Sequence, residues 1–371
     1  MKILIINETC GVGSHGKICV DIAKKYEAEG HIVKIAFGRF FSSKKKYRNL
    51  AIKIGNVFSV FLHVFITRLF DKHGLGSKYS TKRFIKWANI FDPDVLWLHN
   101  IHGYYINYKL LFNWIKSRPS MKVKWTLHDC WAFTGHCSHF TYEKCDKWVT
   151  GCHNPCPCKK EYPSSLLICN AKKNFYAKKQ SFMGVVNMEL ITPSKWLKEL
   201  VEKSFLGSYP INVVKNKIDI DVFKPIENNF KSEYKLNDKF MILAAANVWT
   251  KKKGLLDIIE LANKLDNKKY AVVIIGKIKK RVKASGKNIL VLKRTNSKEN
   301  MAKLFSAADV FVNPTYEDNY PTVNLESEAC GTPVITYDTG GCKETISSSS
   351  FAVETGNIDK IIEIIKGLSK K

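Results

Sequence analysis

The chain has little arginine and few acidic residues. Only seven of its 60 basic residues are arginine, and the 33 acidic residues leave a formal net charge of +27. Proteins that read nucleic acids favour arginine, because its planar guanidinium makes bidentate contacts with bases and phosphates. We therefore expect no nucleic-acid partner. The excess of lysine fits coding bias, attraction to an anionic membrane surface or a diphosphate-bearing substrate, and these three causes remain open.

Long apolar runs are also missing. No segment reaches the roughly 18 to 20 apolar residues that a membrane-spanning helix needs. The sequence begins Met1-Lys-Ile-Leu-Ile-Ile6, which predicts a strand at the start of the chain rather than a signal peptide. We therefore expect a cytoplasmic protein whose membrane contact, where it has one, is with the inner face of the plasma membrane.

The length of 371 residues, 45% of them hydrophobic, exceeds one ordinary core and fits two α/β domains. Short apolar runs alternate with helical patterns, which predicts two Rossmann-like, doubly wound parallel sheets with an interdomain cleft. The runs of the first sheet are 2–6, 33–37, 95–99, 122–127 and 189–193, and those of the second are 211–214, 241–246, 271–276, 289–292, 310–312 and 334–337. Gly207-Ser-Tyr-Pro210 interrupts the pattern, so we expect an N-terminal domain over residues 1–209 and a C-terminal domain over 210–371.

An acidic loop after the run 310–312 carries the strongest functional signal. The predicted strand ends at Pro314, which has no backbone donor, and Pro321 favours a helix start whose free N–H groups suit an anion. The polar candidates of this stretch are Glu317, Asp318, Asn319 and Glu326. Carboxylates accept hydrogen bonds from sugar hydroxyls, and free N–H groups bind phosphates, so the loop favours a nucleotide sugar. Carboxylates that only cap the helix are the alternative.

The order of these residues resembles the signature of retaining glycosyltransferases of family 4, in which two acidic residues separated by seven others hold the donor. Asp318 and Glu326 match that pair, although the family usually has Glu at the first position, and Glu317 is the neighbour of Asp318. The sequence Glu-Asp-Asn-Tyr-Pro is similar to the colanic-acid-type branch, which builds bacterial surface polysaccharides. The resemblance covers nearly the whole chain and implies the GT-B fold. It also implies that Glu326 holds the ribose and that Glu317 or Asp318, with Asn319, holds the transferred sugar.

The resemblance extends to a diphosphate site after the run 241–246. The segment Asn247-Val-Trp-Thr-Lys-Lys-Lys-Gly254 opens a helix, where the macrodipole and the lysine charges add. Lys253 matches the family's diphosphate lysine, whereas Val248 occupies the position of its partner arginine, so one of the two preceding lysines has to replace it. We expect Asn247 and Lys253 to bind the donor and Lys253 to stabilise the leaving diphosphate. A solvated lysine run is the alternative.

The N-terminal domain has a glycine-rich loop directly after its first predicted strand. Gly11, Gly13 and Gly16 fit the pattern Gly-x-Gly-x-x-Gly, which by itself is a weak signal for phosphate binding. In the GT-B fold that the resemblance implies, this loop faces the donor across the cleft. Gly13 and Ser14 are therefore expected to contact the transferred sugar or its phosphate.

Polar residues end two other strands of the N-terminal domain. His99 and His102 follow the run 95–99, and His128 and Asp129 follow the run 122–127, at carboxyl ends where parallel sheets bind ligands. By resemblance, His128 is the active-site histidine, which contacts the donor sugar and phosphate. His99, His102 and Asp129 are then candidates for the acceptor side. Structural histidines with satisfied hydrogen bonds are the alternative.

Six of the eleven cysteines lie in the segment 130–158, which we interpret as an insertion in the N-terminal domain. A cytoplasmic location disfavours disulfides and allows a tetrahedral zinc site. Related sequences carry a similar four-cysteine loop, and the residues that match it are Cys137, Cys145, Cys152 and Cys156. Structural zinc, reduced thiols and disulfides all remain open, and no metal is expected to take part in catalysis.

The apolar segment Asn56–Phe70 is bordered by lysines and arginines. Two interpretations are open: a helix that lies on an anionic bilayer, and a helix buried in the first domain. At the other end, family chains continue into a helix that crosses back onto the first domain. This chain ends at Lys371, so we expect that helix to be absent or the chain to be shortened, with altered domain closure.

The function that these features predict is transfer of a sugar, with retention, from a UDP- or GDP-linked donor onto a glycan or lipid-linked oligosaccharide. The missing arginine at Val248, the aspartate at Asp318 and the short C-terminal end suggest an alternative, a degenerate transferase that binds donor as a scaffold. A basic, cysteine-rich nucleic-acid-binding protein is a weaker alternative, because the arginine or aromatic stripe that it requires is missing.

Overall fold

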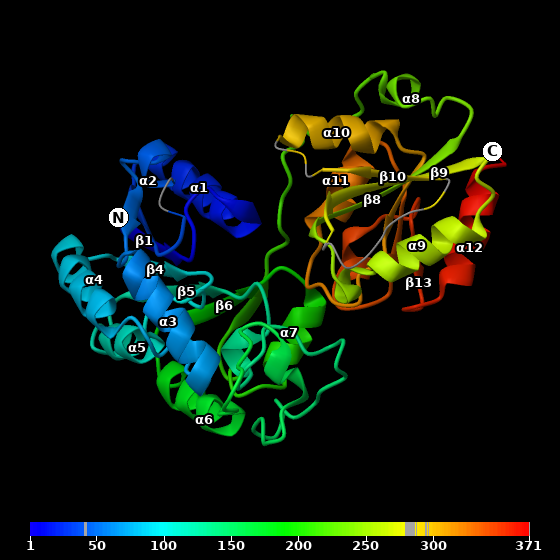
Figure 1. Cartoon of the computed structure of the whole chain (residues 1–371). Helices are drawn as coiled ribbons and strands as arrows, with labels where there is room; N and C mark the ends of the chain where they lie inside the picture. Colours follow the sequence, from blue (N-terminus) through cyan, green and yellow to red (C-terminus); the bar gives the residue numbers. More distant parts are fainter. Residues whose placement is uncertain (41–42, 279–285, 287, 294, 296, 371) are drawn as a thin grey trace. The chain divides into compact units, whose positions relative to one another are not determined.

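The computed structural model describes residues 1–40, 43–278, 286, 288–293, 295 and 297–370. These residues form two compact units, Met1–Val214 and Lys215–Lys371, each built around its own parallel sheet (Figure 1). In the described part of the chain, every helix is too short or too polar to cross a membrane. The doubly wound fold class predicted from the sequence is confirmed in both units.

The N-terminal sheet has seven strands in the order β3-β2-β1-β4-β5-β6-β7, and each pairs with its neighbours in parallel. Their bounds are β1 (Lys2–Asn7), β2 (Ile32–Phe37), β3 (Ala51–Lys53), β4 (Val95–Leu98), β5 (Lys122–Thr126), β6 (Met188–Thr192) and β7 (Ile211–Val213). Successive side chains of a strand point to opposite faces, so Leu4 and Ile6 enter one core and Ile3 and Ile5 enter the other.

Helices cover both faces of this sheet. The smaller core packs against α1, and the larger core packs against α4, α5, α6 and α7, which lie on the opposite side in Figure 1. The helical segments of this unit are α1 (Gly13–Ala28), α2 (Ser43–Lys46), α3 (Val57–Phe70), α4 (Lys78–Phe91), α5 (Tyr108–Lys116), η1 (Trp131–Phe133), η2 (Pro157–Lys160), α6 (Ala171–Phe182) and α7 (Lys195–Glu202). Burial on both faces explains why the strands read as nearly continuous apolar runs.

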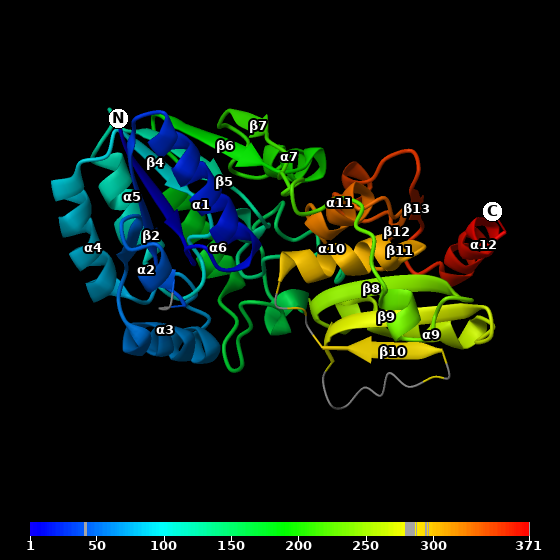
Figure 2. The same cartoon turned by 90° about the horizontal axis from the view of Figure 1, so that it is seen from above.

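The C-terminal sheet has six parallel strands in the order β10-β9-β8-β11-β12-β13, and Figure 2 shows β8, β9 and β10 side by side. Their bounds are β8 (Phe240–Val248), β9 (Tyr270–Lys277), β10 (Ile289–Leu292), β11 (Val310–Asn313), β12 (Val334–Tyr337) and β13 (Phe351–Val353). One core lies between this sheet and α9 with α12, and a second lies between its other face and α10 with α11.

The helical segments of the C-terminal unit are α8 (Phe230–Glu233), η3 (Lys251–Lys253), α9 (Leu255–Lys264), α10 (Lys298–Ala307), α11 (Thr322–Ala329), η4 (Cys342–Thr345) and α12 (Ile358–Leu368). Side chains cap several of them: Ser297 accepts a hydrogen bond from the amide of Asn300, and Asn357 accepts one from the amide of Lys360. Such caps satisfy backbone donors that a helix leaves open at its first turn.

One strand lies in a different sheet from the one predicted. The run 211–214 was expected to open the second sheet, but β7 pairs with β6 through Leu190, Ile191 and Thr192 and therefore closes the first. An apolar run of three or four residues specifies a strand but not its partner, since the partner depends on the path of the chain. The short edge strands β3 and β13 were not predicted.

Candidate functional site

The N-terminal sheet gathers polar residues at its topological switch point, between β1 and β4. Chain order reverses there, so the connections that leave the carboxyl ends of β1 and β4 run to opposite faces and open a crevice. His15, from the first turn of α1, has its Nδ1 2.8 Å from the side-chain nitrogen of Asn100, which follows β4. The switch point therefore joins the glycine-rich loop to the end of β4.

Three histidine rings stack beside this point. The rings of His15 and His128 are 4.1 Å apart at 26°, and those of His99 and His128 are 5.3 Å apart at 17°. The Nδ1 atom of His99 lies 3.0 Å from Nε2 of His128, within hydrogen-bond distance. Burial, followed by the charge of His15, lowers the pKa of His99 to about 3, and the same causes lower that of His128 well below its usual value. Burial thus favours the neutral imidazole of His99 and of His128, and a neutral imidazole can donate or accept hydrogen bonds.

A buried ion pair lies in the same crevice. Nε2 of His102 is 2.9 Å from a carboxylate oxygen of Asp129, and both side chains are less than 15% exposed. Burial lowers the pKa of His102, but the attraction of Asp129 outweighs it, so the net shift is upward. For Asp129, burial raises the pKa, but the attraction of His102 outweighs burial and lowers the pKa to about 2. The ion pair therefore favours the charged form of both side chains, whereas burial favours the neutral form of His99 and His128.

A small cavity lies next to these groups. Its lining includes the four N-terminal candidates and Asn100, namely His99, Asn100, His102, His128 and Asp129. The structure therefore brings together the four residues that the sequence analysis assigned to the catalytic and acceptor sides. A polar cavity at the carboxyl edge of a parallel sheet is a normal place for a small ligand.

The glycine-rich loop has the backbone conformation that its sequence suggests. Gly11 and Gly13 have positive φ of 68° and 70°, and Gly16 packs so closely that a Cβ would lie 2.4 Å from the hydroxyl of Thr9. These features turn the chain sharply from β1 into α1. Gly13 and Ser14 are exposed at the N-terminal end of this 16-residue helix, where backbone N–H groups point outward.

The C-terminal sheet shows the same arrangement at its own switch point, between β8 and β11. The η3 turn follows β8, the acidic loop follows β11, and two ion pairs join them across 65 residues of sequence. Nζ of Lys252 is 2.7 Å from Glu317, and Nζ of Lys253 is 2.7 Å from Asp318. The amide of Tyr316 also donates to the carbonyl of Lys252 at 2.8 Å. Two of the three lysines of the run, Lys252 and Lys253, are therefore paired with the acidic loop.

The two ion pairs differ in exposure. The side chains of Lys252 and Glu317 are 16% and 9% exposed, whereas those of Lys253 and Asp318 are 38% and 26% exposed. Burial lowers the pKa of Lys253, but Asp318 raises it by more, so the ammonium keeps its charge. A ligand at this edge therefore meets Lys253 and Asp318 more readily than the inner pair.

Two glycines next to the Lys253–Asp318 pair lie so close to neighbouring backbone that no side chain fits at their positions. Gly254 has φ 70°, and a Cβ there would lie 2.2 Å from the carbonyl oxygen of Pro314. Gly340 also has positive φ, and a Cβ there would lie 1.9 Å from the carbonyl oxygen of Asp318. The same oxygen accepts a hydrogen bond from the amide of Gly341 at 3.2 Å. Glycine is required at both positions, because only glycine combines positive φ with this close approach.

Helix α11 begins and ends where the sequence predicts. Pro321 precedes its first residue, and Gly331, with φ 86°, follows its last turn. Within the acidic loop, Asn319 is 4% exposed. Glu326 lies in the middle of α11, a partly buried position. The loop and the helix thus hold the four polar candidates at one sheet edge.

The end of β8 is irregular. Its pairing with β9 shifts between Ala245 and Val248, and Asn247 and Val248 are exposed there. Val248, which the resemblance aligns with a diphosphate arginine, therefore offers no charge, and Lys252 is held by Glu317. Of the two lysines that the sequence analysis considered as replacements, Lys251 is the exposed one.

The cysteine-rich segment does not support the zinc prediction. Cys137, Cys145, Cys152 and Cys156 do line one small cavity, but within the described residues no group of three or more His, Cys, Asp or Glu is arranged to hold a metal ion. Cys152 instead accepts a hydrogen bond from the amide of Gly135 at 3.1 Å, and burial raises its pKa to about 11. A protonated, buried thiol behaves as a small core residue.

The sequence analysis missed two residues at these edges and one pairing. His15 and Asn100 complete the crevice of the first sheet, and Lys252 holds Glu317 in the second. His15 had a detectable signal, since it lies inside the glycine-rich loop that opens α1. The pairing of Lys252 with Glu317 had none, because it depends on which loops the switch point brings together.

Comparison with known proteins finds a family for the C-terminal part of the chain and a relative over its full length. Residues 226–371 match the family model "Glycosyl transferases group 1". The "Putative colanic acid biosynthesis glycosyl transferase WcaC" of Escherichia coli (strain K12) is 23% identical over 386 aligned positions, which span 100% of this chain and 90% of that protein.

Solved structures show the same fold over the whole chain. Sucrose-phosphate synthase from Thermosynechococcus elongatus has a TM-score of 0.67 at 11% identity and covers 100% of this chain and 90% of that one. Anabaena Alr3699/HepE, in complex with UDP and glucose, has a TM-score of 0.64 at 14% identity, with 99% and 89% covered. The C-terminal part of the chain thus resembles the group 1 glycosyltransferases, and the whole chain has the GT-B fold of these structures.

Proposed function

We propose that the chain transfers a sugar from a UDP- or GDP-linked donor onto a lipid-linked glycan of a bacterial surface polysaccharide, at the inner face of the plasma membrane. The observation that carries this proposal is the edge of the C-terminal sheet, where Nζ of Lys253 lies 2.7 Å from a carboxylate oxygen of Asp318. Ammonium and N–H groups suit a diphosphate, and a carboxylate suits sugar hydroxyls. A nucleotide sugar carries both kinds of group.

The donor site that we propose assigns one part of the ligand to each group. Lys253 takes the diphosphate, Asp318 and Asn319 take the transferred sugar, and Glu326 takes the ribose. Bond cleavage leaves positive charge at the anomeric carbon and negative charge on the departing diphosphate. Stabilising that leaving group with a fixed cation is usually the largest electrostatic contribution to such a transfer.

The ion pair with Asp318 keeps Lys253 charged before the donor arrives, because the carboxylate raises the pKa of the ammonium. Retention requires the acceptor to attack from the side of the leaving group. We propose that the departing phosphate accepts the proton of the acceptor hydroxyl there, as the family resemblance implies. No side chain then has to serve as covalent nucleophile.

For the acceptor we propose the crevice of the N-terminal sheet, with His99, His102 and Asp129. The neutral His99 can donate to or accept from a hydroxyl, and the charged pair His102–Asp129 can orient a second one. The role of His128 at the donor sugar, and those of Gly13 and Ser14, are proposed on the same basis. Each rests on position at the sheet edge together with family resemblance.

The names of the similar proteins support two finer points. Alr3699/HepE is described as a complex with UDP and glucose, which favours UDP as the base-bearing group of the donor. WcaC is described as a colanic acid biosynthesis enzyme, which favours a surface polysaccharide as the product. The lipid link of the acceptor is proposed because such glycans are assembled on membrane carriers.

Donor hydrolysis by point variants tests this assignment. We expect Lys253→Ala to lower the turnover of the preferred nucleotide sugar by roughly 10²- to 10³-fold, the usual cost of removing one group that stabilises developing charge. Lys268→Ala is the matched control, since it removes an exposed lysine that precedes the amino end of β9, and it should change turnover less than threefold. Equal turnover in the wild type and Lys253→Ala would refute the donor site.

A further inference from the structure

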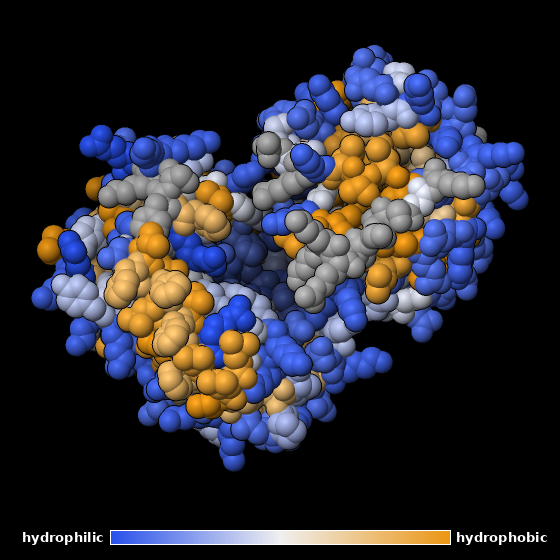
Figure 3. Space-filling view, viewed as in Figure 1, coloured by the Kyte–Doolittle hydropathy of each residue, from blue (hydrophilic) through white to orange (hydrophobic). Residues whose placement is uncertain are grey.

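Helix α3 (Val57–Phe70) exposes its apolar side chains and buries polar ones. Its fully buried residues are His63 and Thr67. Its exposed residues are large and apolar: Val57, Phe58, Phe61, Leu62, Phe65 and Phe70, between 41% and 71% exposed. Figure 3 shows the corresponding hydrophobic patch over α3. The interpretation of this segment as a buried helix is therefore wrong.

Specific hydrogen bonds fix this inverted orientation. Nε2 of His63 accepts from the amides of Gly74 at 3.0 Å and Gly76 at 3.2 Å, and its Nδ1 lies 2.9 Å from the hydroxyl of Ser77. Gly76 lies so close that a Cβ there would come within 2.5 Å of the imidazole ring. The helix cannot roll its phenylalanines inward without breaking all of these contacts.

A second segment adds to the patch at the C-terminal end of α3. Leu166, Leu167 and Ile168 are 64%, 67% and 43% exposed. The amide of Leu166 donates to the carbonyl of Arg68 at 2.7 Å, and that of Ile168 donates to the carbonyl of Leu69 at 3.3 Å. These bonds satisfy carbonyls that a helix end leaves open, so the apolar tripeptide is held against α3.

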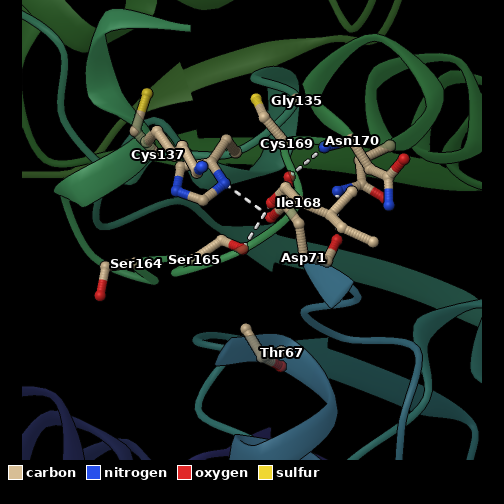
Figure 4. Close-up of polar contacts among 12 residues, drawn as sticks. Thr67, Asp71, Gly135, Cys137, Ser164, Ser165, Ile168, Cys169 and Asn170 are labelled. Carbon is tan, nitrogen blue, oxygen red and sulfur yellow. Dashed lines mark hydrogen bonds and ion pairs between the residues drawn. The ribbon is translucent and has the colours of Figure 1, made fainter. Parts of the chain in front are cut away.

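Asp71 locks the two segments together, as Figure 4 shows. Its carboxylate accepts from Nδ1 of His136 and from the amide of Asn170, both at 2.7 Å, while Asn170 donates from its side chain to the carbonyl of Phe70 at 2.8 Å. Asp71 is fully buried. The patch is thus a rigid surface of the N-terminal unit, which we call the α3 face and define as the exposed apolar residues of α3 with Leu166, Leu167 and Ile168.

The sequence around the α3 face is strongly basic. Residues 43–91 contain eleven lysines and arginines and a single acidic residue, Asp71, whose charge is buried. Exposed basic residues of this stretch include Lys72, Lys78, Lys82, Arg83 and Lys86. A large apolar patch with cationic surroundings matches the two contributions that bind a protein to an anionic bilayer: burial of apolar area and attraction to acidic headgroups.

We propose that the α3 face inserts into the headgroup boundary of an anionic membrane. Its occupant is lipid rather than a second copy of the chain, because two molecules of charge +27 repel each other whereas acidic lipids attract both. The proposal rests on the proposed function in one respect: a lipid-linked acceptor brings the enzyme to a bilayer. It adds which surface makes that contact.

Cosedimentation of the full-length protein with vesicles tests the proposal. We expect tight binding to vesicles of phosphatidylglycerol and phosphatidylethanolamine, and at least tenfold weaker binding to vesicles of pure phosphatidylcholine. Binding to the anionic vesicles should weaken as salt rises from about 0.1 to about 0.5 M, because salt screens the attraction between lysines and acidic headgroups. The double variant Phe61→Ser/Phe65→Ser should bind at least tenfold less, with an unchanged melting temperature. Leu167→Ser is a milder second variant, and Val186→Ser, an apolar residue 77% exposed elsewhere in the unit, is the matched control.

Vesicle binding and hydrolysis of the nucleotide sugar, measured on the same variants, distinguish the role of the α3 face from that of the donor site. Hydrolysis of the free nucleotide sugar should be the same in the wild type and in both α3 variants, since no lipid takes part. Equal vesicle binding by the wild type and the double variant would overturn the α3 face. A wild-type dimer in sedimentation analysis that the double variant abolishes would assign the face to a second copy instead. Loss of hydrolysis in Lys253→Ala without loss of vesicle binding leaves the proposal intact.

Discussion

At the residue scale, the structure separates two carboxylates that the sequence treats as equivalent. Glu317 forms the inner pair with Lys252 and is 9% exposed, while Asp318 forms the outer pair with Lys253 and is 26% exposed. A buried partner supports the fold, and an accessible one can bind a ligand. Neutralising Glu317 should therefore affect mainly stability, and neutralising Asp318 should affect mainly activity.

We expect Glu317→Gln to destabilise the C-terminal unit by about 3 kcal/mol, because it leaves the charge of Lys252 buried without its partner. Asp318→Asn should change stability little, since its pair is more exposed, but should lower transfer at least tenfold. Urea unfolding and steady-state kinetics of both variants measure this difference. The reverse pattern, a stable Glu317→Gln that loses activity, would assign the sugar-facing role to Glu317.

Buried histidines make stability depend on pH. His99 has a pKa lowered to about 3 by burial, against an ordinary value of about 6.5 in the unfolded chain. Between these values the unfolded state binds a proton that the folded state does not. Stability should therefore fall as pH falls from about 6.5 towards about 3, by up to about 1.4 kcal/mol per pH unit for each such group.

Replacing one of these groups tests the sign. His99→Gln removes one titrating site, so its unfolding free energy, measured with urea at several pH values, should depend less steeply on pH than that of the wild type. The matched control is His153→Gln, which removes an exposed histidine from the same unit. Parallel curves for the wild type and His99→Gln would show that His99 does not titrate on unfolding.

At the element scale, the turns that connect strands to helices position the candidate site residues of both sheets. The two sites lie at the β1/β4 and β8/β11 switch points, where adjacent connections run to opposite faces. Gly254 joins η3 to α9 at positive φ and lies against the carbonyl of Pro314. This turn therefore fixes Lys253 relative to the acidic loop.

Gly254→Ala should misplace that turn. The added Cβ would lie 2.2 Å from a backbone oxygen, and positive φ strains alanine by about 1 to 3 kcal/mol. We expect weaker binding of UDP, measured by calorimetry, together with a lower melting temperature. Gly184→Ala is the control for strain alone, because Gly184 has φ 79° but no atom near its would-be Cβ. UDP binding that Gly254→Ala leaves intact would contradict this role.

The sequence predicted the elements that hold the candidate site residues, and the reason is local. Strand ends, the glycine turn and Pro321 are each specified by a few neighbouring residues. The pairing of Lys252 with Glu317, the stack of His15 on His128 and the sheet membership of β7 depend on sheet topology, so no short pattern contains them. The inverted face of α3 was undecided for a similar reason. The apolar run is plain in the sequence, but the side that the helix buries depends on hydrogen bonds between His63 and the turn that follows α3, at Gly74 and Gly76.

At the scale of the whole molecule, the chain consists of two units with separate cores. The cores of the N-terminal unit and those of the C-terminal unit share no residue, and each unit has helices on both faces of its sheet. A ligand stabilises the unit that binds it, because it binds the folded form and not the unfolded one. Thermal unfolding can therefore assign each substrate to a unit.

We expect UDP to stabilise the C-terminal unit selectively. At 100 times its dissociation constant, UDP should add about 2.7 kcal/mol to the stability of the unit that binds it. In differential scanning calorimetry of the full chain, the transition assigned to the C-terminal unit should therefore rise. Glu317→Gln identifies that transition by lowering it, and Lys253→Ala should remove the effect of UDP. A rise confined to the other transition would move the donor to the N-terminal unit, and the division of labour proposed for the two sheet edges would be reversed.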